Sequence, residues 1–275
     1  MGDFARDTRV EAVEGTRFRA SLHPDWEIWG PNGGYLAAIA LRAAGAVARV
    51  QRPVAFYAHF LSVARFDEVS LEVVPLRQGR RAESLRVSLS QRGKPVLEGL
   101  LKTASEGPGL EHEAVQMPQV ARPEALASIE ELLPSERPRY AFWKNLESRP
   151  LRPERVGRSP EPREAQWREW YRFRPRACFD DPWVDAARLL LLIDTLSWPA
   201  AVGPHPETDF VAPNLDVVAW FHAFEPESEW LLADVQAPLA SAGLIGTTAR
   251  VWSRSGRLLA SGGAQLLCAP AVPDG

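Results

Sequence analysis

An internal repeat is the feature that most constrains how this chain can fold. In the first half, a helix-like segment at Asn32–Val50 precedes four segments rich in Val, Leu and aromatic residues: PVAFYAHFLSVARF, VSLEVVPLR, RAESLRVSLSQRG and KPVLEGLLKT. In the second half, a helix-like segment at Pro182–Val202 precedes PNLDVVAWFHAF, EWLLADVQAPLA, GLIGTTARVWSRSG and RLLASGGAQLLC. Each half therefore predicts one helix followed by four antiparallel strands.

Two landmarks support the repeat. The triplets AHF and AWF align Phe60 with Phe221, and the hairpin sequences SQRGKPVLEG and SRSGRLLASG align Gly93 with Gly256. Further strands at TRFRASL and QWREWYRFRP would complete the two units. A unit of about 100 residues that occurs twice predicts two similar domains in one chain.

The composition of the first helix, GGYLAAIALRAAGAVA, predicts how each unit packs. The segment is almost entirely small or apolar, so it must be buried on most sides. A strongly curved antiparallel sheet wrapped around the helix achieves this. The predicted fold class is α+β, with two such units side by side forming one continuous curved sheet and a helix pair on its inner face.

The segment between the repeats has a different composition. It is dense in proline and charge, which predicts a long surface connection with one short helix near Leu126–Leu133. We therefore predict a first unit at residues 1–106, a linker at 107–163, and a second unit at 164–275.

Composition excludes several classes of protein. The apolar fraction of 45% and the charged fraction of 24% are ordinary for a soluble globular protein, and the net charge of −3 gives a nucleic-acid role no electrostatic support. No GxSxG, GxGxxG, P-loop or His/Cys cluster occurs, so we expect no cofactor and no metal. No signal peptide and no apolar run of roughly 18–20 residues is visible, which predicts a cytoplasmic protein without a membrane span.

A carboxylate in the stretch LLLLIDTLSWPA is the main candidate for chemistry. On a helical projection, Asp185, Arg188 and Thr195 fall on one side of the second helix. Asp194 falls nearly opposite, on the apolar face formed by Trp183, Ala187, Leu190 and Trp198. An unpaired buried charge costs several kcal/mol, so Asp194 is either a hydrogen-bonded structural acid or a catalytic one. The first helix has no carboxylate, so this role belongs to the second unit alone.

Two stretches resemble a known family. The segments WEIWGPNGGYLAAIALRA and WFHAFEPESEWLL, with SRSGRLLASGGAQLL further on, are similar to the acyl-CoA thioesterase II-type family, double-hotdog proteins that hydrolyse acyl-CoA. The resemblance covers both halves and leaves the linker unmatched. It implies a double hotdog fold and an acyl-CoA substrate.

The resemblance also implies a catalytic set in the second unit. The family uses an Asp on the second helix, a Thr or Ser before the aromatic strand, and a Gln near the end of the sheet, which together hold a water. These positions match Asp194, Asn214 and Gln265. Asn214 replaces the family's Thr or Ser, and the spacing to Gln265 is one residue longer. The matching positions of the first unit hold Pro53 and Lys102, so we expect one working site per chain.

The residue types suit this chemistry. A thioester is intrinsically activated and needs only a positioned water, a general base and an oxyanion donor. An aspartate in an apolar pocket has a raised pKa, which makes it a better base, and amides can orient a water. The turn GPNGGY can bring backbone N–H groups close to a ligand. We expect substrate contacts from Gly33, Gly34, Tyr35 and Trp198, and contacts to the CoA phosphates from Arg80 and Arg81.

Several alternatives remain open at this level. An ordinary solvent-facing strand residue is the alternative for Gln265, and a turn residue is the alternative for Asn214. A hotdog hydratase would need a His beside the acid, but none follows Asp194 before His205. A non-catalytic acyl-CoA or lipid-binding hotdog protein is a further alternative, because Asn214 stands where the family has Thr or Ser. Hotdog sheets commonly associate, so a homodimer or higher oligomer is a further expectation that the sequence does not fix.

Overall fold

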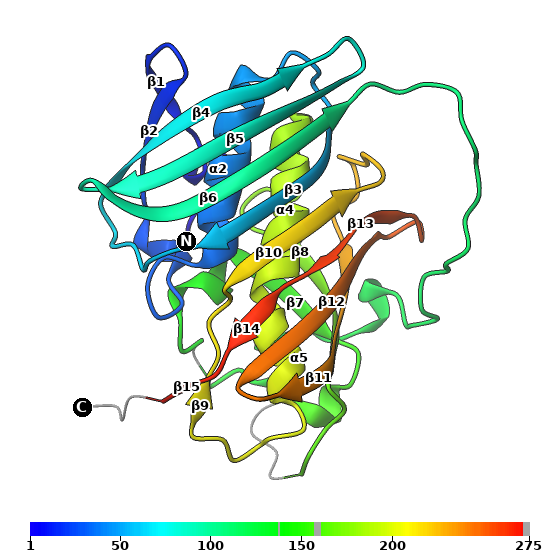
Figure 1. Ribbon diagram of the computed structural model, residues 1–275. Helices are drawn as coiled ribbons and strands as arrows, with labels where there is room; N and C mark the ends of the chain where they lie inside the picture. Colours follow the sequence, from blue (N-terminus) through cyan, green and yellow to red (C-terminus); the bar gives the residue numbers. More distant parts are fainter. Residues whose placement is uncertain (137, 157–160, 272–275) are drawn as a thin grey trace.

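The computed structural model describes residues 1–136, 138–156 and 161–271. Its main element is a 13-stranded sheet with the strand order β1-β2-β4-β5-β6-β3-β10-β13-β12-β11-β8-β7, and β14 pairs with β12. Two long helices, α2 (Gly33–Val47) and α4 (Pro182–Thr195), lie side by side against its inner face (Figure 1). The predicted α+β architecture, with one continuous sheet and a helix pair, is confirmed.

The strands of the first unit are β1 (Glu11–Glu14), β2 (Arg17–Ser21), β3 (Pro53–Phe60), β4 (Glu68–Gln78), β5 (Ala82–Gln91) and β6 (Lys94–Ala104). Later in the chain come β7 (Leu146–Pro150), β8 (Gln166–Phe173), β9 (Phe210–Val211), β10 (Asp216–Phe221), β11 (Leu231–Ser241), β12 (Leu244–Ser253), β13 (Leu258–Gly263), β14 (Gln265–Leu267) and β15 (Ala269–Pro270). The shorter helices are α1 (Phe4–Asp7), α3 (Ile129–Leu132) and α5 (Ser197–Val202).

The strand order makes the internal repeat visible. Outward from the middle of the sheet run β3, β6, β5, β4 and β2 on one side, and β10, β13, β12, β11 and β8 on the other. The two halves join where β3 pairs with β10, with Tyr57 opposite Val218 and Ala55 opposite Trp220. The two units are therefore related by an approximate two-fold axis at this seam.

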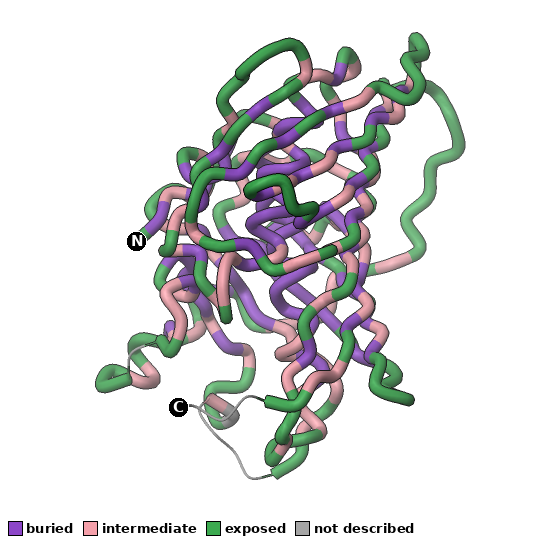
Figure 2. Tube along the Cα trace, turned by 60° about the vertical axis from the view of Figure 1, so that its left-hand side comes forward, coloured by how far each residue is buried: buried purple, intermediate pink, exposed green. Residues whose placement is uncertain are grey.

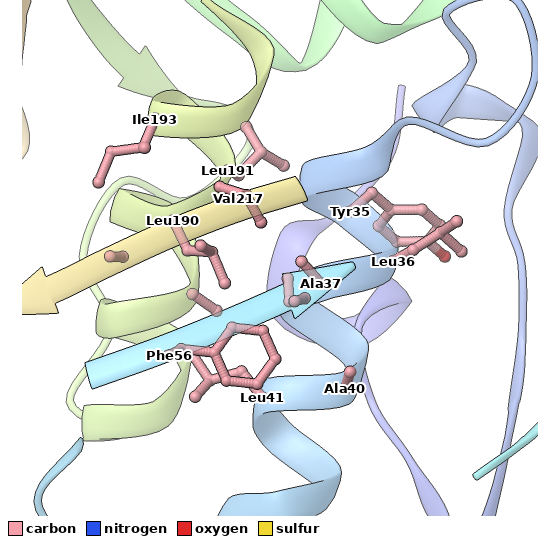
Figure 3. Packing of buried hydrophobic residues seen from close by; sticks show 14 of the residues in the cluster. Tyr35, Leu36, Ala37, Ala40, Leu41, Phe56, Leu190, Leu191, Ile193 and Val217 are labelled. Atoms are coloured by element: carbon pink, nitrogen blue, oxygen red, sulfur yellow. The ribbon is translucent and has the colours of Figure 1, made fainter. Parts of the chain in front are cut away.

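Close contact between α2 and α4 depends on glycine. A Cβ atom on Gly34 would lie 2.9 Å from the Cα of Leu191, and one on Gly45 would lie 2.3 Å from the Cδ2 of Trp183. Figure 3 shows Leu190 and Leu191 of α4 beside α2, with Phe56 of β3 and Val217 of β10 packed nearby. The helix pair and the inner face of the sheet thus form one apolar core.

The second helix differs from its prediction in two respects. It ends at Thr195, and Leu196 separates it from α5, so the expected segment Pro182–Val202 is interrupted. The side that carries Asp185 and Arg188 is also buried, because Arg188 pairs with Asp185 at 2.5 Å and donates to three backbone carbonyls. The helix is therefore buried all round. Figure 2 shows that buried chain, in purple, occupies the middle of the molecule.

The linker is only partly the surface connection that we predicted. Residues 105–114 are exposed, and Figure 1 shows this stretch running along the outside of the molecule. Phe142, in contrast, is fully buried, and Leu146–Pro150 forms β7, which pairs with β8. Other linker residues, Met117 and Val120 among them, pack on a second apolar cluster formed by Trp170, Trp230, Leu232 and Trp252. The sequence of β7, LESRP, has only one apolar side chain besides proline, which is too little pattern to predict a strand.

Candidate active site

The carboxylate of Asp194 lies where the end of α4 meets the start of α2. Its side chain is buried, with 4% of the residue exposed. The Oδ2 atom accepts a hydrogen bond of 2.5 Å from the backbone N–H of Gly34, and Oδ1 accepts one of 2.7 Å from Nδ2 of Asn214. Three distant parts of the chain, α2, α4 and the residues before β10, therefore meet at one carboxylate.

Two glycines let the start of α2 approach this carboxylate. A Cβ atom on Gly33 would lie 3.1 Å from Oδ2 of Asp194 and 3.0 Å from Cζ of Phe60. One on Gly34 would lie 3.1 Å from the Cβ of Asp194. Backbone N–H groups at a helix start carry a partial positive charge and favour an anion. Glycine at both positions thus allows the Gly34 N–H to come within hydrogen-bonding range of the carboxylate.

Asn214 makes two contacts with the same residue. Besides the carboxylate, its Nδ2 donates to the backbone carbonyl of Asp194 at 2.9 Å, which satisfies a carbonyl at the end of α4. Both hydrogens of the amide therefore point to Asp194. Nothing in the described part of the chain donates to the amide oxygen of Asn214, which leaves that atom able to accept a hydrogen bond from a ligand or water.

The electrostatics of the site suit a base that works near neutral pH. Burial raises the pKa of Asp194 to about 6, while the hydrogen bonds from Asn214 and Gly34 act in the opposite direction. Burial dominates because it disfavours the charged form more than the two donors favour it. The carboxylate is therefore mostly ionised at neutral pH and is a stronger base than an exposed aspartate.

Gln265 is not brought to Asp194. Its neighbours Ala264 and Leu266 are buried, and Leu266 pairs with Asn214 in an isolated bridge. Side chains alternate along a strand, so Leu266 faces the inner side and Gln265 the outer side. The register between β10 and the following strands shifts by one residue here, since Val218 pairs with Gly263 but Asn214 with Leu266. The extra residue of this shift lies on the β10 side, because Asn214–Val218 spans one residue more than Gly263–Leu266. The additional residue before Gln265 that the resemblance indicated is not a bulge against β12, which pairs with β13 and β14 in one register.

Tyr35 and Trp198, from which we expected substrate contacts, make no hydrogen bond to Asp194 in the described part of the chain. The Tyr35 hydroxyl donates to the Asp7 carbonyl at 2.8 Å and accepts from the His23 N–H at 3.1 Å, and its ring stacks on Trp26. In Figure 3 this ring is directed away from α4. Trp198 lies on α5, beyond the break at Leu196, so the helical projection that placed it beside Asp194 does not apply.

Arg80 and Arg81 lie far from the carboxylate. They are exposed in the turn between β4 and β5, and the Arg81 carbonyl accepts a hydrogen bond from Ser105. That end of the sheet adjoins the C-terminal end of α2, because Glu83 accepts from the N–H groups of Arg49 and Val50. Asp194 adjoins the other end of α2, about 20 Å away along the helix axis. The structure does not bring these arginines to the site.

Asn32 and Thr195 are site residues that the sequence reasoning missed. Nδ2 of Asn32 donates to the hydroxyl of Thr195 at 3.1 Å, directly beside the contact between Gly34 and Asp194. The sequence held a partial signal, because Asn before a helix start is a common N-cap. Its partnership with a residue in the other unit was not visible from the sequence.

The described residues contain no group of three or more His, Cys, Asp and Glu side chains that could hold a metal ion. None of the described helices is long and apolar enough to cross a membrane. His205, the nearest histidine after Asp194 in the sequence, is exposed. The chemistry available at the site is therefore that of a buried carboxylate, an amide and backbone N–H groups.

Solved structures place this architecture in the hotdog class. A protein of unknown function with a hotdog fold from Alicyclobacillus acidocaldarius superposes with a TM-score of 0.83 at 22% identity, over 98% of both chains. An acyl-CoA thioesterase II from Mycobacterium marinum superposes with a TM-score of 0.78 at 19% identity, over 99% of both chains. The tesB protein of Mycobacterium avium subs paratuberculosis gives 0.77 at 23% identity, over 97% of this chain and 98% of that chain.

Family models define the class more narrowly. Residues 22–103 match the acyl-CoA thioesterase N-terminal domain, and residues 117–268 match the acyl-CoA thioesterase C-terminal domain. The second match alone covers more than half of the chain. This chain therefore belongs to the acyl-CoA thioesterase family, and the double hotdog fold expected from the sequence is confirmed.

Proposed function

We propose that this chain hydrolyses the thioester of a fatty or other acyl-CoA at one site per chain, centred on Asp194. The observation that carries the proposal is a buried carboxylate at the start of α2, with hydrogen bonds from Gly34 and Asn214. Family membership supports the reaction class. The equivalent position on α2 lacks a carboxylate, which supports a single site.

In this mechanism, a water donates one hydrogen bond to the Asp194 carboxylate and one to the amide oxygen of Asn214. Its lone pair is then free to attack the thioester carbonyl as Asp194 takes the proton. The N–H of Gly33, which has no acceptor in the described chain, is our choice for the oxyanion donor. Collapse of the intermediate breaks the C–S bond, and Asp194 returns the proton to the thiolate, giving a carboxylic acid and the CoA thiol.

The test is release of free thiol from a panel of acyl-CoAs of different chain length. We expect Asp194→Asn to lower kcat by roughly 10²–10⁴-fold, since the amide cannot accept the proton. Asp67→Asn, the same change at an exposed aspartate, is the control and should leave kcat unchanged. Hydrolysis that is unaffected by Asp194→Asn would rule out the assignment of the general base.

The dependence of the rate on pH gives a second check. Below the raised pKa of about 6, the Asp194 carboxyl is protonated and cannot act as a base. We expect kcat/KM to rise with pH through about 6 and then to level off. The value at pH 5 should be roughly tenfold below the plateau. A profile that is flat between pH 5 and 8 would contradict this role.

A non-catalytic acyl-CoA or lipid-binding protein is the second candidate. It is favoured by the outward-facing side chain of Gln265 and by the amide at position 214, where the family has a hydroxyl. Binding of acyl-CoA by the wild-type chain, measured by calorimetry, without turnover at any chain length would establish this alternative.

A further inference from the structure

A buried side-chain pair joins the two units beside Asp194. Nδ2 of Asn32 donates to Oγ1 of Thr195 at 3.1 Å, and the Thr195 hydroxyl lies 3.4 Å from Oδ1 of Asn32. Asn32 and Thr195 are 6% and 9% exposed, respectively. Loss of one partner of a buried hydrogen bond is costly, because the remaining polar group is left unpaired away from water.

Asn32 has a second contact that explains why it is an asparagine. Its Oδ1 atom accepts from the backbone N–H of Tyr35 at 2.9 Å and so caps the start of α2. Ser, Thr or Asp could accept this bond equally well, but none of them carries an amide that also donates across to Thr195. The choice of Asn therefore serves the contact between the helices as well as the cap.

Each member of the pair is a close neighbour in the chain of one partner in the Gly34–Asp194 contact. Asn32 precedes Gly34 by two residues, and Thr195 directly follows Asp194. A rotation of α2 about the Gly34–Asp194 bond would therefore stretch the Asn32–Thr195 bond. Two bonds between the same helix ends fix a geometry that one bond alone leaves free to rotate.

We propose that Asn32 and Thr195 are positioning residues that hold the start of α2 on Asp194, so that the Gly34 N–H stays on the carboxylate. This inference rests on the proposed function for its effect on catalysis. It goes beyond that function because neither residue touches the reacting atoms. Their role is to keep Gly33 and Gly34 within reach of the reaction centre.

The pair should influence the pKa of Asp194 through Gly34. The Gly34 bond lowers that pKa, so loosening it should raise the pKa further. Ionisable side chains on the elements packed around α4 have other partners or face solvent. On α2, Tyr35 and Arg42 bond to residues other than Asp194. On β3 and β10, Tyr57 and Asp216 bond to each other, and His59 of β3 and Arg250 of β12 are exposed. The elements α5 and β13 carry none. Burial, Asn214 and Gly34 are thus the influences on this carboxyl in the described chain.

The test compares Thr195→Val, which removes the hydroxyl at nearly constant volume, with Thr195→Ser, which keeps it. Ser197→Ala is the control, because it also removes a buried hydroxyl near the end of α4, one bonded to Ile193 and Thr247 instead of α2. We expect the acid limb of kcat/KM to move upward by roughly half to one pH unit in Thr195→Val. It should stay in place in Thr195→Ser and in Ser197→Ala.

A titration of the Asp194 carboxyl by ¹³C NMR provides a readout that does not depend on turnover. We expect the same upward shift in Thr195→Val, and Asn32→Ser serves as a second variant if Thr195→Val does not fold. An unchanged titration in a folded variant, or an equal shift in Ser197→Ala, would overturn the positioning role. Absence of thioesterase activity in the wild-type chain would refute the proposed function alone and leave the NMR result decisive for the pair.

Discussion

The two ends of the helix pair occupy equivalent places in the repeat but are built in opposite ways. At one end, Gly34 of α2 meets the carboxylate of Asp194 on α4. At the other end, Trp183 of α4 fills the space over Gly45 of α2. The indole Nε1 of Trp183 then donates to Gln51 at 2.6 Å. One end holds a buried carboxylate, and the other is closed by an indole.

The equivalence of the two ends can be read from the helix caps. Gly34 follows the N-cap Asn32 by as many residues as Trp183 follows the N-cap Asp181. Asp194 and Gly45 are likewise at the same distance from those caps. Each of the two crossings, where one end of α2 contacts one end of α4, therefore has a glycine on one helix. The residue opposite that glycine is Asp194 at one crossing and Trp183 at the other. If the proposed function holds, stability and chemistry depend on different ends of the same helix pair.

Replacing the indole should have the largest effect on stability. Trp183 is 6% exposed, and truncation of a buried Trp typically costs about 3–5 kcal/mol. We expect Trp183→Ala to lower the free energy of unfolding by that amount, measured by denaturant titration. The kcat of the folded fraction should stay close to wild type because the Asp194 end is not touched.

The matched control is Trp220→Ala on the outer face of β10, where the tryptophan is 49% exposed. Its effect on stability should be within about 1 kcal/mol. A loss of kcat in Trp183→Ala equal to that in Asp194→Asn would show that the two ends are not independent.

Adding a methyl group at the other crossing should have an intermediate effect. The Cβ of Gly34→Ala would lie 2.9 Å from the Cα of Leu191, which is backbone and cannot move alone. We expect α2 and α4 to separate slightly, with a loss of roughly 1–3 kcal/mol in stability. Because the Gly34 N–H moves with the backbone, thiol release should fall as well. Gly109→Ala, where no atom lies within 4 Å, is the control. Wild-type activity in a destabilised Gly34→Ala variant would show that the close packing of α2 on α4 is not needed for thiol release.

The smallest effect is expected at Gln265. Because its side chain faces the outer side of the sheet, Gln265→Ala should change kcat by less than about twofold and stability by less than about 0.5 kcal/mol. Thiol release and thermal unfolding are the measurements. A loss of activity comparable to that of Asn214→Ala would mean that the Gln265 side chain reaches the site during turnover. The functional difference between the two units would then include the sheet as well as the helix ends.

The sequence predicted those parts of the molecule that depend on local pattern. Alternation of apolar residues located the strands of both units, and the composition of the first helix predicted its burial. The helical projection placed Asp194 on a buried face because that face is apolar along its whole length. It could not show that Arg188 is buried too, since this depends on carbonyl groups of Ala177, Glu225 and Ser228 that only the fold brings together.

Other parts depend on register and on long-range pairing. The face on which Gln265 lies follows from its pairing with Gly246 of β12, next to the buried pair Ile245 and Leu266, and local alternation does not reveal this pairing. The contact of Asn32 with Thr195 joins residues in different units. The distance of Arg81 from the site follows from which end of β5 adjoins the start of α2. Each of these outcomes required the arrangement of the two units in space.

The linker, with its single covalent path from β6 to β7, has a consequence for how this molecule could diverge. In a symmetric pair of separate identical subunits, every substitution appears at both crossings at once. An indole could then replace a glycine only by closing both sites together. Once the two units share one chain, each crossing mutates alone. Because the two units share one chain, the two crossings need not be identical. One can be occupied by a packed indole while the other keeps a buried acid.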